Sequence, residues 1–515
     1  MAGGSFDVIV IGAGHNGLTT ACLLAKKGRR VLVLERRDVT GGLCAGEEFH
    51  PGYRSPGLLH DTACIRPAVV DTLQLTAHGL ELIDEPAVFS PQRDGRGLLL
   101  HSDAAAAASE IAVHSEKDAN AYHAFRVFLE KVRGLVEPVL NDPLPDLESV
   151  SAGGMFGLLR HGLSFRSLGR KHMMELFRVP PMCVADWLRE YFETELLNAS
   201  LATPAILGTW CGPWSPGTAA NLIIRECTAR RAVRGGGAAL VGSLESAARS
   251  LGVDIRTASG VERIDVKKGS VSGVTLAGGE TIDGRAVVSS LDPKSTFLSL
   301  VRPHDIQHKF EHRVQMWRMR GTTAKVHLAV NRPLEFASRP DLRAEHIRTG
   351  EELDQLERAF DAVKYRRFSE RPLLDIYVPT VSRPGDAPSG HDVVSVLAHF
   401  VPYQLDGGWN DEMRERVGDA VVAELETYAP GVTSSIVARE VLTPSDIEFR
   451  YGVTGGHVHH GEHALDQLIT RPTLETTRYA TPIAGLFLCG AGTFPGGGIT
   501  CAPGALAARE VAARL

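Results

Sequence analysis

The chain of 515 residues lacks a long apolar run. No stretch approaches the roughly 18 consecutive apolar residues that a membrane-spanning helix requires. The N-terminus also lacks a basic segment followed by an apolar core, so the sequence predicts neither a membrane span nor a secretory signal peptide. We therefore expect a soluble, cytoplasmic protein.

Excess positive charge and paired cysteines are also missing. The formal net charge is −6 and the pI is near 6.4, so the composition does not attract nucleic acid and we expect no such partner. The eight cysteines include no CxxC pair, which excludes the redox dithiol of flavin disulphide reductases. We predict buried thiols and no metal site.

A second nucleotide-binding motif is absent. Only one GxGxxG sequence opens a strand-to-helix turn, whereas a flavin reductase that is fed by NAD(P)H would need another. This absence favours the substrate itself as the hydride donor. Oxygen, a quinone or a partner protein would then be the final electron acceptor.

The motif that is present lies near the N-terminus. Residues 8–11 form a wholly apolar run that is typical of a buried strand, and a second such run ends at Glu35. Gly12 permits a tight turn, Gly14 lets the backbone approach a pyrophosphate, and Gly17 lets the following helix pack closely. Glu35 is placed to bind ribose hydroxyls and would repel a 2′-phosphate, which leaves FAD or NAD.

The residues after Glu35 distinguish these two cofactors. Gly41 and Gly42 resemble the extended fingerprint of FAD enzymes in the glutathione-reductase and amine-oxidase superfamily. The resemblance implies that the cofactor is FAD. The expected contacts in this first segment are Gly12, Gly14, His15, Asn16, Gly17, Glu35, Arg36, Gly41, Gly42 and Leu43.

Two later segments have the same nucleotide-binding character. Glycines 235–237 precede an apparent helix over 238–251 and several β-like runs. The final segment, 485–515, has the pattern of a strand, a glycine-rich loop and a helix. The β-like runs are 253–257, 261–266, 271–276 and 286–290. Further FAD contacts are expected at Val261, Gly490, Ala491, Gly498, Ile499 and Thr500.

Three nucleotide-type segments that lie far apart imply a discontinuous domain. We predict an α/β fold in which residues 1–75, 231–295 and 451–515 form a Rossmann-type FAD-binding domain. Residues 76–230 and 296–450 would then form an inserted α+β domain that binds or covers the substrate. A homodimer is compatible with this organisation.

The stretch 155–179 is basic and amphipathic. Such a pattern is typical of a helix that lies on a membrane surface, where an apolar substrate would be stored. The alternative is an ordinary solvated helix over the core.

Three blocks of sequence resemble the phytoene-dehydrogenase-related flavoproteins, which include carotenoid desaturases, carotenoid isomerases and retinol saturases. These blocks are 8–46, 235–293 and 490–498. Trp409 and residues 442–467 further resemble the family of pyridine nucleotide-disulphide oxidoreductase domain-containing protein two. Phe494 stands where desaturases often have histidine, which separates this chain from the carotenoid enzymes.

Several residues could take part in flavin chemistry. The loop 498–504 leads into the last helix, so the Ile499 and Thr500 amides are candidates to stabilise negative charge on the reduced ring. Lys325 lies on an expected strand and resembles the lysine that amine oxidases hold near the flavin. Burial would lower its pKa, although a surface position is equally compatible with the sequence.

A group of histidines precedes the final segment. His457, His459, His460 and Glu462 could supply a general acid or base, or they could form structural hydrogen bonds. We expect His457 and His459 to share one face of a strand. His60 could also approach the flavin ring.

These features and the resemblance imply an FAD-dependent oxidoreductase that transfers hydride to or from a carbon–carbon bond of an apolar, polyene-like substrate. Desaturation, saturation and isomerisation all remain open. One alternative is an amine oxidase, although the expected aromatic cage is absent from residues 490–504. Another is a binding protein in which FAD is only structural.

Overall fold

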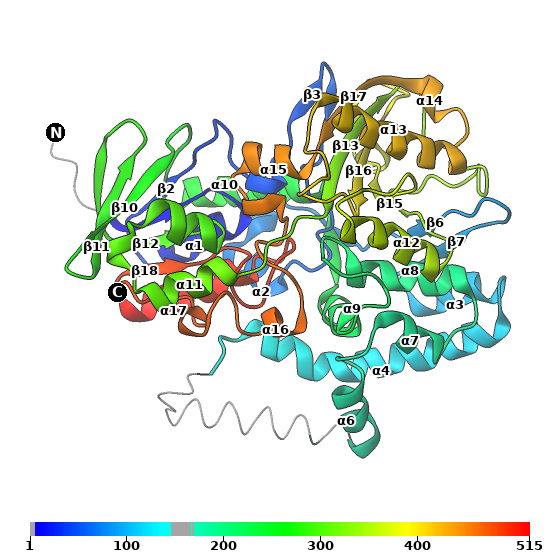
Figure 1. The fold of residues 1–515 in the computed structure, drawn as a ribbon, viewed down its shortest axis with the longest axis horizontal. Helices are drawn as coiled ribbons and strands as arrows, with labels where there is room; N and C mark the ends of the chain where they lie inside the picture. The colour runs from blue at the N-terminus through cyan, green and yellow to red at the C-terminus, as the bar shows by residue number, and fades with distance from the viewer. Residues whose placement is uncertain (1–5, 146–165, 167–168) are drawn as a thin grey trace.

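The computed structural model describes residues 6–145, 166 and 169–515, which build two large sheets (Figure 1). The first sheet is the cofactor sheet, and its order is β10-β11-β12-β1-β2-β9 with β18 beside β12. Its strands are β1 (Phe6–Ile11), β2 (Val31–Leu34), β9 (Asp254–Arg256), β10 (Val261–Lys267), β11 (Ser270–Leu276), β12 (Thr281–Ser289) and β18 (Leu486–Leu488). The pairs of β1 with β2 and β12, of β2 with β9 and of β12 with β18 are parallel, as a Rossmann-type sheet requires.

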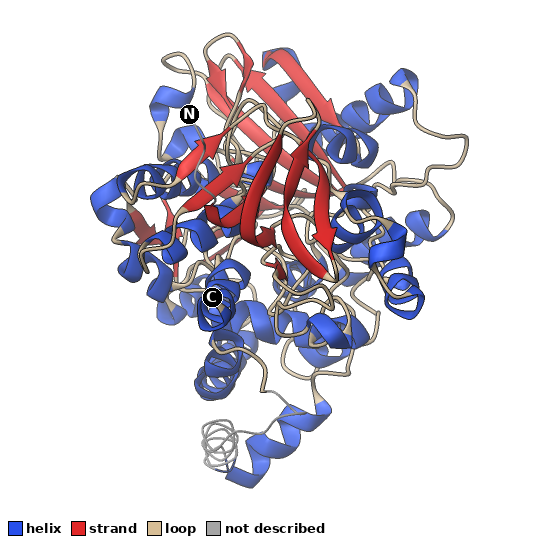
Figure 2. Cartoon of the chain, turned by 90° about the vertical axis from the view of Figure 1, so that its left-hand side faces the viewer, coloured by secondary structure: helices blue, strands red, loops and turns tan. Residues whose placement is uncertain are grey.

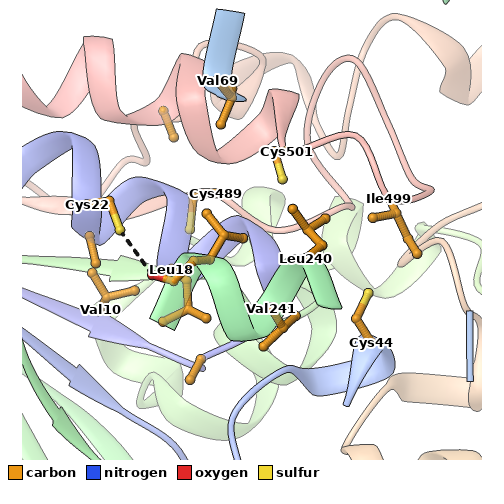
Figure 3. Packing of buried hydrophobic residues seen from close by; sticks show 14 of the residues in the cluster. Val10, Leu18, Cys22, Cys44, Val69, Leu240, Val241, Cys489, Ile499 and Cys501 are labelled. Carbon is orange, nitrogen blue, oxygen red and sulfur yellow. Dashed lines mark hydrogen bonds between the residues drawn. The ribbon is translucent and has the colours of Figure 1, made fainter. Parts of the chain in front are cut away.

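Both faces of the cofactor sheet are covered. One face packs against α1 (His15–Ala25), α10 (Gly236–Ser250) and α17 (Ala502–Arg514), and Figure 3 shows Val10, Leu18 and Leu240 in the apolar layer between them. β1 is an apolar run that is buried on both faces, since Val8 and Val10 belong to this layer and Ile9 to the layer on the opposite face. Figure 2 shows the strands at the centre and top of the view, with helices to the sides and below.

The other face of the cofactor sheet is covered by helical residues that follow the predicted segment 231–295. Phe297, Phe310 and Val314 pack against this face, although they follow residue 295 and were expected in the inserted domain. They come from the helical turn Ser295–Leu300 and from α11 (His308–Met316). Every strand of the cofactor sheet lies within 1–75, 231–295 or 451–515.

The second sheet has the order β17-β13-β16-β15-β14-β6-β7. Its strands are β6 (Val88–Ser90), β7 (Leu98–Leu100), β13 (Thr323–Val330), β14 (His346–Arg348), β15 (Leu373–Tyr377), β16 (Asp392–His399) and β17 (Ile436–Leu442). Side chains alternate along these strands. Ala324 and Val326 pack in the apolar cluster with α13 (Asp411–Tyr428), so Thr323 and Lys325 lie on the opposite face.

A helical layer and a few short elements complete the described chain. The helical layer contains α3 (Ala104–Ala112), α4 (Glu116–Asn141), α6 (Gly169–Arg178), α7 (Val184–Arg189), α8 (Glu195–Ile206), α9 (Thr218–Thr228) and α12 (Leu353–Lys364). The other elements are α2 (Pro67–Leu73), α14 (Val432–Ser435), α15 (Pro444–Tyr451), α16 (Leu465–Leu468) and the strand pairs β3 (Glu48–His50) with β4 (Tyr53–Arg54) and β5 (Leu82–Asp84) with β8 (Arg231–Val233). Within the described ranges, no helix combines the length and the apolar character needed to cross a bilayer.

Candidate active site

A cavity of about 320 Å³, the cofactor cleft, lies at the carboxyl ends of β1 and β2. Ligands of open parallel sheets bind at this edge. The predicted FAD contacts that line the cleft are Gly12, Gly14, His15, Asn16, Gly17, Glu35, Arg36, Gly42, Leu43, Val261, Ala491 and Gly498.

The three glycines of the motif have separate roles. A Cβ at Gly12 or Gly17 would collide with neighbouring protein atoms, so these positions allow β1, α1 and residue Ser290 to pack closely. A Cβ at Gly14 would meet no protein atom within 4 Å. Gly14 is also the N-cap of α1 and provides no side-chain cap. The first amides of α1 are therefore left for an anionic ligand such as a pyrophosphate.

Glu35 is held in place at the end of β2. Its Oε2 accepts a hydrogen bond from the Ala13 amide at 2.8 Å, and its Oε1 accepts one from the Arg37 amide at 2.9 Å. Each carboxylate oxygen can accept a further hydrogen bond, so ribose hydroxyls can still bind. The cleft therefore fits an unphosphorylated ribose, as the sequence predicts.

Four predicted contacts do not line the cleft, and the glycines Gly41 and Gly490 are two of them. A Cβ at Gly490 would lie 2.5 Å from the Ser290 carbonyl oxygen, and Gly41 adopts a φ of +116° with Ala45 at close range. Both glycines shape the backbone around the cleft because of close packing or a left-handed turn. Their prediction as direct contacts is not supported by their position.

The cleft also has residues that sequence reasoning missed. They include Arg37, Ser290, Leu291, Asp292, Ser295, Tyr451, Gly452, Val453 and Val458. Asp292 lies within the block 235–293 that resembles the phytoene-dehydrogenase-related flavoproteins. This resemblance is the sequence feature that could have indicated Asp292. Its carboxylate accepts hydrogen bonds from Thr454 and Ser295 and joins two cofactor segments.

Unpartnered polar atoms show that the cleft is shaped for a polar ligand. His15 Nε2, Arg37 Nη1 and His460 Nδ1 are buried without a hydrogen-bond partner. Burial lowers the pKa of His15 to about 4, so its ring is neutral near pH 7. The residues present thus fit a bound dinucleotide.

A second cavity of about 170 Å³, the substrate cavity, adjoins the cleft. Leu59, Val458 and Gly498 line both. The predicted residues His60, Ile499 and Thr500 line the substrate cavity. Ile499 and Thr500 were expected as FAD contacts, but they do not line the cofactor cleft. The Thr500 amide already donates to the Gly498 carbonyl at 3.1 Å, which leaves Ile499 as the candidate donor to the flavin.

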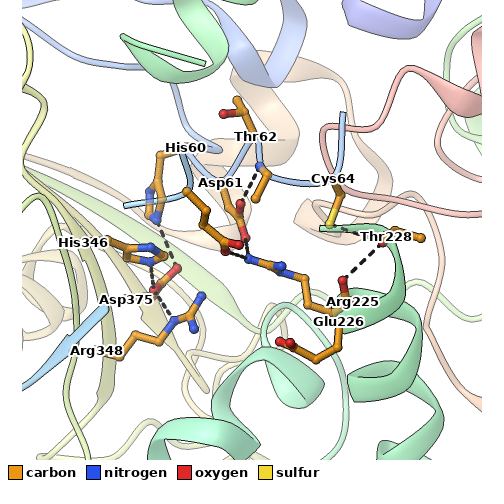
Figure 4. Close-up of polar contacts among 12 residues, drawn as sticks. His60, Asp61, Thr62, Cys64, Arg225, Glu226, Thr228, His346, Arg348 and Asp375 are labelled. Carbon is orange, nitrogen blue, oxygen red and sulfur yellow. Dashed lines mark hydrogen bonds and ion pairs between the residues drawn. The ribbon is translucent and has the colours of Figure 1, made fainter. Parts of the chain in front are cut away.

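Asp375 organises the polar wall of the substrate cavity (Figure 4). Its Oδ2 accepts from His60 Nε2 at 3.0 Å, and its Oδ1 accepts from His346 Nε2 at 2.8 Å and from Arg348 Nε at 3.0 Å. Burial would raise the pKa of Asp375, but His346 and Arg348 hold it well below its ordinary value. The carboxylate is therefore ionised.

His60, His346 and Asp375 have ligand atoms within 4.8 Å of one another. A metal ion could be considered on that spacing. However, Arg348 binds the same carboxylate, and its positive charge opposes a cation at this position. The arrangement is better explained as a hydrogen-bond network.

The bond to Asp375 determines how His60 can act. Because His60 Nε2 donates to the carboxylate, Nδ1 is the unprotonated nitrogen of the neutral ring, and it has no partner. The ring stacks on Tyr377 with centroids 5.3 Å apart. Burial lowers the pKa of His60 to about 4 despite the opposing effect of Asp375. His60 is therefore a neutral, oriented proton acceptor.

Lys325 is fully buried on β13, and its Nζ has no hydrogen-bond partner. Burial lowers its pKa to about 7, although Asp375 favours the charged form. The sequence was also compatible with an exposed position of Lys325, and the burial of its side chain excludes that position. Lys325 lines neither the cleft nor the substrate cavity, but its charge acts on the nearby His60.

The histidine group before the final segment does not lie on a strand. Residues 454–456 form a tight turn with Gly455 and Gly456 at positive φ, and the following chain is irregular. The predicted strand face for His457 and His459 is therefore wrong. The turn instead separates the group: His460 lines the cofactor cleft, whereas His459 lines the substrate cavity.

The positions of two catalytic candidates indicate structural roles. His457 Nδ1 accepts from the amides of His459 and Gly461, and Glu462 binds Arg318 and Arg320. Neither side chain lines the cleft or the substrate cavity. The geometry thus does not support their predicted part in the chemistry.

Comparison with known proteins agrees with this arrangement. Residues 10–64 match the NAD(P)-binding Rossmann-like domain, and residues 95–515 match the flavin containing amine oxidoreductase family. The chain belongs to the flavin containing amine oxidoreductase family. It is a flavin-dependent oxidoreductase, and FAD is its cofactor, which confirms the predicted fold class and cofactor.

Similar proteins cover almost the whole chain. Pyridine nucleotide-disulfide oxidoreductase domain-containing protein 2 of Rattus norvegicus is 32% identical over 541 residues, which cover 98% of this chain and 93% of the relative. A limonene dehydrogenase chain of Castellaniella defragrans is 29% identical, with 98% and 94% covered. Phytoene desaturase of Fusarium fujikuroi is 25% identical, with 96% and 86% covered. The family resemblance seen in the sequence is confirmed.

A solved structure shows the same fold. Cyclohexylamine oxidase from Brevibacterium oxydans superposes with a TM-score of 0.57 at 16% identity and covers 99% of this chain and 98% of its own.

Proposed function

We propose that this protein transfers hydride to or from a carbon–carbon bond of an apolar, polyene-like substrate that binds in the substrate cavity. The main support is the substrate cavity, which adjoins the cofactor cleft and is lined by many aliphatic side chains. These are Leu59, Leu140, Leu207, Ile224, Leu397, Val458, Leu468 and Ile499. Desaturation, saturation and isomerisation are the three directions that this chemistry allows.

The relatives support this proposal through their names. Limonene dehydrogenase and phytoene desaturase are named for reactions of hydrocarbons. A similar activity is a reasonable expectation for a chain that is similar over nearly its full length.

Bound FAD supplies a hydride acceptor or donor. Removal of two hydrogens from adjacent carbons also requires a proton acceptor. His60 supplies it, because its Nδ1 is unprotonated, Asp375 holds the ring through Nε2, and the residue lines the substrate cavity. In saturation, the same nitrogen would deliver the proton.

Amine oxidation is a second candidate, which the buried Lys325 with a pKa near 7 favours. The lining of the substrate cavity argues against amine oxidation. No tyrosine, tryptophan or phenylalanine is among the described residues that line the substrate cavity, so the aromatic cage of amine oxidases has no counterpart there. A purely structural use of FAD is the third candidate.

Anaerobic mixing tests these candidates. The oxidised holoprotein is mixed separately with polyenes and with amines, and the flavin absorbance is followed. Bleaching by polyenes alone supports the proposal, and bleaching by amines alone overturns it. Isomerisation would require reduced flavin and cause no net electron transfer. Flavin that only dithionite reduces would indicate a structural cofactor.

We also propose that the stretch 155–179 contacts a membrane surface. Residues 155–165, 167 and 168 lie outside the described residues, so the support comes from α6, where Met174 and Phe177 are exposed beside Arg170 and Lys171. Sedimentation with anionic vesicles tests this contact. The double variant Met174→Glu and Phe177→Glu should bind less, and equal binding would overturn the proposal.

A further inference from the structure

Arg66 is a buried cation in the wall of the substrate cavity. It is 6% exposed and stands directly before α2. Its Nη1 donates to the Cys64 carbonyl oxygen at 3.1 Å, and its Nε is buried without a partner. Among the described residues, no carboxylate lies within ion-pair distance of its guanidinium.

The other charges of the cavity wall are already paired. Arg225 binds Asp61 at 3.2 Å and also binds Glu85, whereas Arg348 binds Asp375 at 3.0 Å. Glu137 acts on Arg66 over a longer distance, but it forms its ion pair with Arg230. Of the three arginines that line the cavity, Arg66 is the one without a carboxylate at ion-pair distance among the described residues.

The histidines do not change this balance. His60, His399, His459 and His463 line the cavity, and burial lowers the pKa of each below the ordinary value of histidine. They are neutral near pH 7 and add no positive charge. Arg66 is therefore a buried cation without a carboxylate partner among the described residues, which is unfavourable unless an anion joins it.

The cofactor phosphates are not that anion. Arg66 is not part of the lining of the cofactor cleft, where the amides of α1 face the pyrophosphate position. The Arg66 amide donates to the Thr500 carbonyl at 3.0 Å, which anchors this residue beside the loop that separates cleft and cavity. A ligand that pairs with Arg66 must therefore occupy the substrate cavity.

We infer that the substrate is an apolar molecule that carries an anionic oxygen group, such as a carboxylate, and that Arg66 binds this group. The inference rests on the proposed function and narrows its substrate class. Aliphatic side chains receive the chain of the substrate, and Arg66 neutralises its charge. A pure hydrocarbon would leave Arg66 without a counter-ion.

Binding of a fluorescent probe pair tests the inference without turnover. The probes are cis-parinaric acid, a conjugated polyene with a carboxylate, and its neutral methyl ester. Each is titrated into the holoprotein, and the fluorescence increase gives its Kd. We expect the acid to bind at least about tenfold tighter than the ester. Equal affinities, or no binding of either probe, would overturn the inference.

Variants locate the anion. Arg66→Gln should abolish the preference for the acid and leave the affinity for the ester unchanged, whereas Arg66→Lys should keep part of the preference. Arg126→Gln is the matched control, because Arg126 pairs with Glu226 and does not line the substrate cavity. A preference for the acid that survives Arg66→Gln would contradict the assignment. If Arg66→Gln loses FAD, the preference for the acid is compared between Arg66→Lys and the wild type. A preference that is unchanged in Arg66→Lys would then contradict the assignment.

Two further results separate this inference from the proposed function. Bleaching of the flavin by neutral polyenes, with no preference for the acid, would support the function and overturn the role of Arg66. Tight binding of the acid without any flavin chemistry would support the role of Arg66 and overturn the proposed function. A change in the flavin potential of Arg66→Gln without a change in probe preference would assign Arg66 to the cofactor and overturn the inference.

Discussion

The cofactor cleft and the substrate cavity adjoin, but different chemical groups form them. The motif that opens the cleft consists of closely spaced glycines and the amides at the start of α1, so neighbours in sequence create it. The polar wall of the cavity consists of ionisable side chains, and His60 and Asp375 in it are 315 positions apart. Backbone groups recognise what all dinucleotides share, whereas side chains from distant segments can select one substrate.

The two regions also differ in electrostatics. The cleft offers backbone dipoles and a carboxylate that is held by amides. The cavity wall combines an ionised Asp375, neutral histidines and an arginine without a carboxylate partner among the described residues, all in a buried setting. Low solvent access strengthens each charge interaction there. Substitutions should therefore affect binding of the cofactor and catalysis separately.

The largest expected effect is the loss of FAD from Gly14→Val. The added side chain would enter space that is free of protein atoms, so the fold should persist while the pyrophosphate is excluded. Absorbance and extraction of bound flavin measure occupancy, and circular dichroism checks the fold. Gly242→Val is the control, since its side chain also meets open space but lies away from the cleft. Full FAD occupancy in Gly14→Val would contradict the assignment of the cleft.

His60→Gln should separate catalysis from cofactor binding. Loss of an oriented general base slows proton transfer by about 10²- to 10⁴-fold. FAD should remain bound, because His60 does not line the cleft. Anaerobic stopped-flow measurement of flavin bleaching gives the rate. His457→Gln, at a position that lines neither region, should keep the rate, and equal slowing of both variants would refute the distinction.

Lys325→Met should stabilise the protein by a few kcal/mol near pH 7. The buried ammonium has a pKa of about 7 instead of 10.5, so the unfolded chain binds this proton more tightly than the folded chain does. The cost is therefore fully present below pH 7 and declines by about 1.4 kcal/mol per pH unit as the pH rises to 10.5. Thermal unfolding across this range measures the gain. Lys27→Met at an exposed position should show no such trend; a destabilised Lys325→Met protein would contradict this account.

Acidification below pH 6.5 should also weaken the fold. The pKa values of His15, His60 and His459 are lowered to about 4 and that of His399 to about 3, all by burial. Unfolding therefore takes up protons below pH 6.5, and each histidine removes about 1.4 kcal/mol of stability per pH unit between pH 6.5 and its folded pKa. Denaturant unfolding at pH 7, 6 and 5 measures the slope. His60→Gln should show a smaller slope than the wild type, and a flat wild-type profile would contradict the burial of these rings.

The histidine group illustrates where a sequence pattern fails. His457, His459 and His460 are close together in the chain, and this spacing left open a general acid or base and structural hydrogen bonds. In the structure His459 and His460 line different cavities, His457 lines neither, and Glu462 pairs with Arg318 and Arg320. Asp375, His346 and Arg348 carried no sequence signal, because Asp375 is one acid in β15 and the other two flank Ile347 in β14, outside any motif. Pairing of β14 with β15 brings them together.

The sequence by itself determined the cofactor class. A tight turn, a helix start and Glu35 are local features, so consecutive residues are sufficient to define the phosphate and ribose positions. Only the tertiary structure decided which ionisable groups share a buried cavity, that His60 is neutral and oriented, and that Arg66 lacks a carboxylate among the described residues. These properties depend on burial and on contacts between distant segments, which the order of residues does not display.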